Sequence, residues 1–137
     1  MTAKEYLRQL KTLDCLIKAK ELEKERLETM ATKITLPLSD CKVETTPDKS
    51  KNENLIIQIS ELKEEIKRQY ARYLELYGVI IQEIEGMEDT RFKTILTMHY
   101  INGANFEKVS NALGYEKRWT LALHSRALKT FEKKYLY

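Results

Sequence analysis

Side chains that can bind an anionic ligand lie close together near the C-terminus of this 137-residue chain. Lys117 and Arg118 follow Gly114 by a few residues, and Arg126 and Lys129 come later in the same segment. Ammonium and guanidinium groups bind phosphate oxygens, and arginine can also donate two parallel hydrogen bonds to a guanine edge. The residue types therefore indicate nucleic-acid chemistry. Lys117 and Arg118 would reach bases or phosphates, and the later pair suits phosphates.

A helix must position these side chains, and the apolar pattern predicts one from about Glu116 to Lys133. The face expected to be buried consists of Thr120, Leu123, Ala127, Leu128 and Phe131. The candidate DNA-binding residues face outward or sideways and are Lys117, Arg118, Trp119, Leu121, Ala122, Ser125, Arg126 and Lys129. Two interpretations of Trp119 remain open, namely contact with a thymine methyl or sugar and packing against a neighbouring helix.

A shorter helix is expected just before Gly114, and its inner face is predicted to consist of Phe106, Val109, Ala112 and Leu113. Asn105 can cap this helix, because its side-chain oxygen can accept an orphan backbone N–H. Gly103 and Gly114 can end helices, because glycine takes the left-handed conformation without steric cost. Two short helices joined by a tight glycine turn are typical of a helix-turn-helix, whose second helix can enter the DNA major groove. A preceding helix over about 88–102, capped by Asp89 or Thr90, completes a three-helix unit over 88–137.

Positive charge is concentrated in this C-terminal unit. Residues 1–87 hold 15 basic and 16 acidic side chains, a net charge of −1, whereas residues 88–137 hold 9 and 5, a net charge of +4. A local excess of positive charge favours binding to a polyanion. An ordinary basic surface is the alternative explanation.

Two long helices are expected before residue 88, which predicts an all-α fold. Residues 3–32 carry a heptad seam in which Lys20 and Lys24 interrupt the apolar positions, which are Tyr6, Leu10, Leu13, Ile17 and Leu27. The predicted seam of residues 53–85 continues to Met87 and consists of Leu55, Ile59, Leu62, Ile66, Tyr70, Tyr73, Tyr77, Ile80, Ile84 and Met87. Seams of this period are typical of coiled coils. We expect an antiparallel hairpin over residues 1–87, although pairing between chains is equally allowed.

Gly78 interrupts the second long helix. Glycine costs about 1 kcal/mol relative to alanine inside a helix. Its presence is explained either by tolerated weakness or by the close approach of another backbone.

Residues 33–52 contain both prolines of the chain and a run of polar residues, which predicts a linker. Cys15 and Cys41 are far apart, and no signal peptide is apparent, so both thiols are expected to be free in a reducing cytoplasm. No apolar run approaches the roughly 20 residues needed to span a bilayer. The sequence therefore predicts a cytoplasmic protein that does not enter membranes.

No constellation of residues indicates an enzyme, and we expect no catalytic residues, cofactor or metal. Gly-rich phosphate loops and zinc-ligand spacings are missing from the sequence. His99 and His124 are predicted to lie on different helices without a neighbouring cysteine or acid, so we interpret both as surface or packing residues.

The C-terminal segment resembles the promoter-reading C-terminal domain of bacterial sigma factors. The motifs that carry this resemblance are Tyr100-Ile101-Asn102-Gly103, Leu113-Gly114-Tyr115 and Arg126-Ala127-Leu128. The whole chain is similar to the small phage-encoded regulators of the RinA and ArpU type, which combine two long helices, a polar linker and a sigma-like helix-turn-helix. It departs from their usual pattern at Glu116, Thr120 and Ala122, and the fold is expected to tolerate all three.

The resemblance implies a transcriptional regulator of phage or prophage genes that binds double-stranded DNA. Host RNA polymerase is a further candidate partner. A homodimer through the long helices is expected, because one short reading helix rarely supplies enough specificity. The alternative is a protein-interaction adaptor that docks on RNA polymerase or a phage protein without reading DNA.

Overall fold

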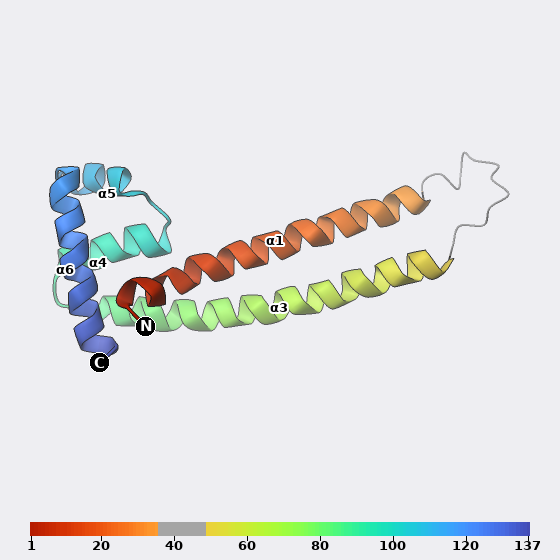
Figure 1. Cartoon of the computed structure of the whole chain (residues 1–137), viewed down its shortest axis with the longest axis horizontal. Coiled ribbons are helices and arrows are strands. Elements are labelled where there is room, and N and C mark those ends of the chain that lie inside the picture. The colour runs from red at the N-terminus through yellow and green to blue at the C-terminus, as the bar shows by residue number, and fades with distance from the viewer. Residues whose placement is uncertain (36–48) are drawn as a thin grey trace. The chain divides into compact units, whose positions relative to one another are not determined.

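The computed structural model describes residues 1–35 and 49–137, and all the regular structure in these ranges is helical. The prediction of an all-α protein is therefore confirmed. The elements are α1 (Ala3–Thr35), α3 (Lys49–Glu85), α4 (Thr90–Leu96), the π-helical turn η1 (Thr97–Ile101), α5 (Phe106–Leu113) and α6 (Lys117–Tyr135). Figure 1 labels the α-helices.

The long helices extend a few residues into the predicted linker, to Thr35 from one side and from Lys49 on the other. The rest of that linker, with Cys41, lies outside the described residues. The single helix predicted over 88–102 is wrong in one respect, because its second half is the π-helical turn η1. The backbone N–H of Asn102 donates to the carbonyl oxygen of Thr97, five residues back (3.0 Å), which widens the helix at this point.

Local capping produces the ends of the C-terminal helices, as the sequence predicts. The side-chain oxygen of Asp89 accepts from the backbone N–H of Arg91 (2.9 Å), and that of Asn105 accepts from Lys108 (2.9 Å). Gly103 and Gly114 both have a φ of 72°. Gly114 ends α5 in the left-handed conformation, and the chain then turns into α6.

The two glycines Gly114 and Gly78 should respond to alanine in opposite directions. Gly114→Ala forces a Cβ into the left-handed region and should lower the free energy of unfolding by about 1–2 kcal/mol. Gly78→Ala should raise it by about 1 kcal/mol, because Gly78 is helical and a Cβ there would meet nothing within 4 Å. Urea unfolding followed by circular dichroism measures both. Equal destabilisation by the two substitutions would contradict the prediction.

The described residues group into two compact units. Unit 1 comprises Met1–Asp14 and Tyr73–Tyr137, and unit 2 comprises Cys15–Arg72. This division differs from the predicted domains 1–87 and 88–137. The first turns of α1 and the last turns of α3 fall in the same unit as α4, α5 and α6, because they share the larger core with α4 and α6, and these two helices also pack against α5.

Two apolar clusters hold unit 1 together. The larger one joins α1, α3, α4, η1 and α6 through the buried residues Ala3, Leu7, Leu10, Ile80, Ile84, Met87, Leu96, Tyr100, Ala127 and Phe131. The smaller one joins α4, α5 and α6 through Ile95, Val109 and Leu123. Since α6 contributes to both clusters, its orientation is set along most of its length.

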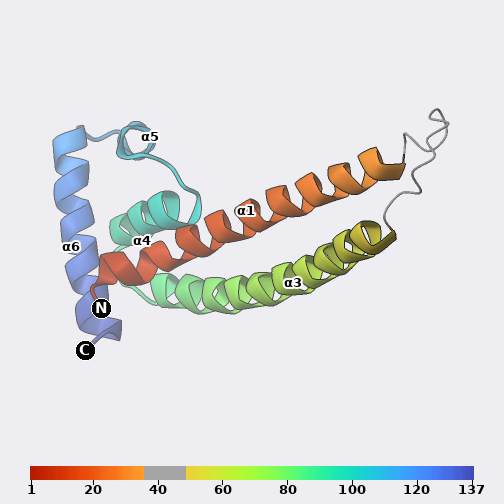
Figure 2. The same ribbon diagram turned by 45° about the vertical axis from the view of Figure 1, so that its right-hand side comes forward.

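In unit 2, segments of α1 and α3 lie side by side in both views (Figures 1 and 2). The ammonium nitrogen of Lys20 lies 3.9 Å from a carboxylate oxygen of Glu65. Leu27, further along α1, lines a hollow with Gln58 and Leu62, which precede Glu65 on α3. As the residue number rises along α1, the number of its neighbour on α3 falls, so these segments run antiparallel.

The seam predicted on α3 is wrong at Tyr70. Tyr70 is 51% exposed, whereas Gln69 is half-buried and its amide donates to Glu65 (2.9 Å). Tyr70 was predicted to lie in the seam because it is less polar than Gln69. The side of α3 that packs inward nevertheless carries Gln69.

The predicted seam is also wrong at Tyr77, which is 36% exposed, whereas Leu76 is half-buried and packs against the larger apolar cluster. With Gln69 and Leu76 in the seam, the spacings from Ile66 through Tyr73 to Ile80 are three, four, three and four, so the heptad is regular there.

Candidate nucleic-acid interface

One face of α6 is packed into unit 1, which leaves the opposite face exposed. The buried residues of α6 are Thr120, Leu123, His124, Ala127 and Phe131. The burial predicted for Thr120, Leu123, Ala127 and Phe131 is confirmed, and Leu128 is half-buried. The hydroxyl of Thr120 donates to the carbonyl oxygen of Glu116 (3.1 Å), so this polar residue is accommodated in the core.

The eight candidate residues all lie on the accessible part of α6. Seven are exposed, and Ala122 is half-buried. At 100° per residue, the centre of the exposed face is a row with spacings of four, three and four that consists of Arg118, Ala122, Ser125 and Lys129. Lys117 and Leu121 flank this row on one side, and Trp119 and Arg126 flank it on the other. A single groove can therefore contact the row and at most part of each flank.

The exposed face of α6 is strongly basic. The helix carries six basic residues and one acidic residue, Glu132. Lys117 and Arg118 occupy its first turn, directly after the turn made by Gly114. Both are exposed and free to reach a ligand outside the chain.

Trp119 and Arg126 form a pair on the surface of α6. The guanidinium carbon of Arg126 lies 5.3 Å from the centroid of the Trp119 ring, a cation–π contact. Trp119 is nevertheless 40% exposed, so much of its ring remains accessible. The contact holds the Arg126 side chain along the helix, so Trp119 and Arg126 would meet a ligand together.

Aromatic and imidazole rings pack behind the exposed face of α6. The Tyr100 hydroxyl and Nε2 of His124 are hydrogen-bonded at 2.8 Å. His99 lies with its ring centroid 5.5 Å from that of His124 and is hydrogen-bonded through Nδ1 to the carbonyl oxygen of Ala104 (2.9 Å). His99 also stacks on Phe106, with 4.1 Å between ring centroids. Of the two roles that the sequence left open for the histidines, surface or packing, the structure shows packing for both, and their contact across η1 and α6 has no signal in the sequence.

The Tyr100 hydroxyl and the His124 ring are both neutral near pH 7. Burial, followed by electrostatic interaction with His99, Lys4 and Arg8, lowers the pKa of His124 to about 4. Burial raises the pKa of Tyr100 to about 12. Removal from water disfavours the charged form of each group, so the hydrogen bond joins two neutral rings near neutral pH.

The inner face predicted for α5 is wrong at one position. Ala112 is exposed, and Ser110 is buried in its place. The hydroxyl of Ser110 donates to the carbonyl oxygen of Phe106 (2.7 Å), which satisfies it inside the helix. α5 packs mainly against α6 and η1, and Ile95 of α4 joins Val109 in the smaller cluster. Ser110 lies on the buried side of α5, whereas Ala112 lies on the exposed side.

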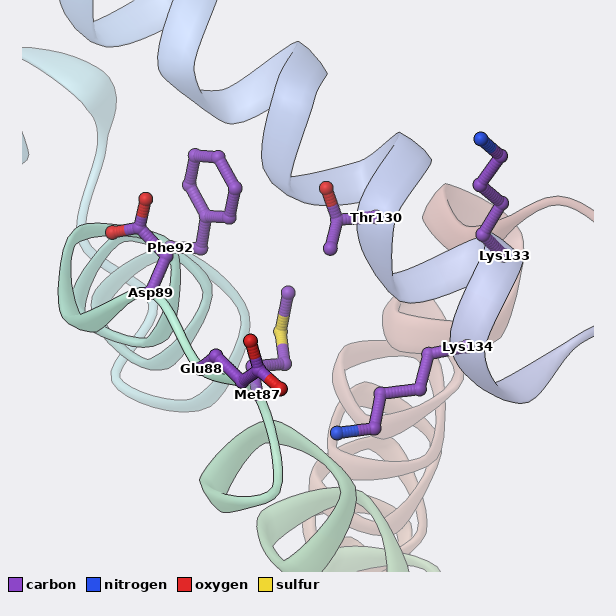
Figure 3. A pocket seen from close by; sticks show the side chains of 7 residues that line it. All are labelled: Met87, Glu88, Asp89, Phe92, Thr130, Lys133 and Lys134. Atoms are coloured by element: carbon purple, nitrogen blue, oxygen red, sulfur yellow. The ribbon is translucent and has the colours of Figure 1, made fainter.

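A pocket of about 450 Å³ lies beside the C-terminal half of α6 (Figure 3). Its lining combines the apolar Met87 and Phe92 with charged residues of both signs. Lys134 extends toward Glu88 and donates to the carbonyl oxygen of Gly86. The Asp89 carboxylate is paired with the Arg91 guanidinium (3.0 Å), which lowers the pKa of Asp89. Lys134 and Asp89 therefore already have partners within the chain, and the pocket is not a candidate ligand site.

Within residues 1–35 and 49–137, no three His, Cys, Asp or Glu side chains cluster as metal ligands would. None of the described helices is long and apolar enough to cross a bilayer. Cys15 is an exposed free thiol. Comparisons with protein families, with curated proteins and with solved structures found no match to this chain.

Proposed function

We propose that this protein is a DNA-binding transcriptional regulator that places α6 in the major groove. The observation that carries the proposal is the row Arg118, Ala122, Ser125 and Lys129, exposed except for the half-buried Ala122, on a helix whose opposite face is buried. A recognition helix needs one buried face and one exposed face, because packing of the buried face fixes which side chains of the exposed face reach the bases.

The surrounding elements suit a helix-turn-helix. In this proposal α5 and α6, joined through Gly114, form the motif, and α4 with η1 supplies the third helix. The two long helices form an antiparallel coiled-coil hairpin that carries this unit and supplies a homodimer contact. The likeness to RinA- and ArpU-type regulators supports a role in phage or prophage transcription in the cytoplasm, with host RNA polymerase as a further partner.

The residues of the exposed face divide by chemistry. Arg118 can donate to a guanine edge or a phosphate, and Lys129, about 16 Å further along the helix, suits a phosphate at the far side of the contact. Ser125 can donate or accept a hydrogen bond, whereas Ala122 offers only an apolar contact to a thymine methyl. Lys117 and Arg126 add phosphate contacts from the two flanks.

The test is DNA binding as a function of salt. A duplex of about 30 base pairs, enriched from a random library with the full-length protein, is titrated by fluorescence anisotropy at several salt concentrations. Lys117→Ala/Arg118→Ala should weaken binding at least about tenfold and reduce the slope of log affinity against log salt by up to about 2. Lys51→Ala/Arg72→Ala removes the same charge from exposed positions on α3 and should change neither.

Failure to enrich any duplex, or an equal loss in both double variants, would contradict a DNA-reading role for α6. An adaptor is the second candidate, favoured by the 40% exposure of both Trp119 and Leu121. Large apolar side chains at a surface are common in protein interfaces. An adaptor would bind duplex DNA no better than a protein without a basic helix.

A further inference from the structure

A second regular face runs along α3, separate from the seam that includes Gln69, Tyr73 and Ile80. Its residues are spaced by four, three, four, three and four, and they are Lys67, Ala71, Leu74, Gly78, Ile81 and Glu85. Five of them are exposed, and Ile81 is half-buried. Leu74 is 50% exposed, and a Cβ placed on Gly78 would meet nothing within 4 Å. A heptad-spaced apolar face left open in this way is suited to another helix.

The order of residues along this face is self-complementary. When two copies of α3 cross antiparallel about a two-fold axis level with Leu76, Leu74 of each copy faces Gly78 of the other. Ala71 then faces Ile81, and Lys67 faces Glu85. Each large side chain meets a small residue, and each terminal charge meets its opposite. A two-fold interface requires this reciprocity, in which residue i contacts j and j contacts i. The Lys67 ammonium lies 3.5 Å from Glu64 of its own chain, but the Lys67 side chain is 76% exposed and can also reach Glu85 of the second copy.

A parallel pairing lacks these matches. Like residues would face each other, so that Lys67 meets Lys67 and Glu85 meets Glu85, and the opposed like charges would repel. Gly78 would face Gly78 while Leu74 faces Leu74, which leaves a gap at one level and crowding at the next. The antiparallel arrangement is therefore the one that the residue order selects.

We propose that a second copy of this chain docks antiparallel on the Lys67–Glu85 face of α3, with Leu74 of each copy packed over Gly78 of the other. The inference rests on the homodimer of the proposed function and names its contact surface. The face spans about 27 Å at 1.5 Å per residue. A contact of this size is smaller than a standard interface, so the dissociation constant should fall in about the micromolar range.

Charge reversal tests the antiparallel match. Sedimentation velocity of the full-length protein, over about 1–300 µM, should show a monomer–dimer equilibrium. Lys67→Glu and Glu85→Lys should each weaken dimerisation about tenfold, because every dimer contains two copies of the pair. The double variant Lys67→Glu/Glu85→Lys restores both pairs and should dimerise as the wild type does. A double variant at least as weak as the two single variants would overturn the proposal.

Gly78→Leu tests the close approach. The new side chain enters space that is open in one chain. At about 1 µM, where dimerisation adds little to stability, circular dichroism should therefore show undiminished helix and a thermal midpoint no lower than that of the wild type. Dimerisation should nevertheless be lost, because the side chain occupies the place of Leu74 from the second copy. Unchanged dimerisation in Gly78→Leu would refute the docking mode.

The two proposals fail in different experiments. Lys117→Ala/Arg118→Ala should lose DNA binding and still dimerise with wild-type affinity, since neither residue lies on α3. A wild-type protein that remains monomeric at about 300 µM and still binds the enriched duplex would overturn the dimer face alone. A dimer that responds to the charge reversals but binds no duplex would overturn DNA reading alone.

Discussion

Phe131→Ala should lower the free energy of unfolding by about 3–5 kcal/mol, a large fraction of the stability of a small domain. Phe131 is fully buried, and its ring lies 5.8 Å from that of Tyr6 and 4.9 Å from that of Tyr135. It belongs to the apolar cluster that joins the first turns of α1 to the last turns of α3 and to α6. Truncation removes buried apolar surface and leaves a cavity where these helices meet, so unit 1 should lose its tertiary packing first.

Trp119→Ala is the matched control, because it removes an aromatic ring from the same helix. Trp119 is 40% exposed and contacts Arg126, so its loss should cost less than about 1 kcal/mol. Urea unfolding followed by circular dichroism and near-ultraviolet absorption compares the two variants. Similar midpoints for Phe131→Ala and Trp119→Ala would show that the cluster around Phe131 does not hold unit 1 together.

Acidification from pH 7 to pH 4 should destabilise the fold by about 3 kcal/mol through His124 alone. The pKa of His124 falls from 6.5 to about 4 on folding, because the ring is buried and lies near His99, Lys4 and Arg8. Between these two values the unfolded chain binds a proton that the folded chain does not. Stability is therefore complete above about pH 6.5 and declines as the pH falls toward 4.

His124→Gln isolates this contribution, because glutamine does not titrate and can still hydrogen-bond the Tyr100 hydroxyl. The free energy of unfolding of both proteins is measured by urea titration at half-unit steps from pH 7.5 to 4. The wild type should lose stability steeply over this interval, and the variant much less. The Asp89 carboxyl, whose pKa is lowered by the Arg91 guanidinium, contributes at the acid end in both proteins. Parallel curves would rule out His124 as the group responsible.

The candidate site was predictable from the sequence to a useful extent. The spacing of four between Leu123, Ala127 and Phe131 identifies the buried side of α6, and exposure of Lys117 and Arg118 follows from the same helical period. The half-buried position of Ala122 and the contact of Arg126 with Trp119 were not predictable. They depend on neighbouring side chains and rotamers, which spacing along one helix does not specify.

The sequence by itself determined the features that depend on near neighbours in the chain. The helical segments, the caps at Asp89 and Asn105 and the left-handed Gly114 follow from backbone chemistry within a few residues. Only the tertiary structure decided that Gln69 rather than Tyr70 faces inward, that Ser110 replaces Ala112, and that His99 meets His124. These outcomes depend on which faces of distant helices meet. Several faces of an amphipathic helix can satisfy the same apolar pattern, and burial between elements selects one of them.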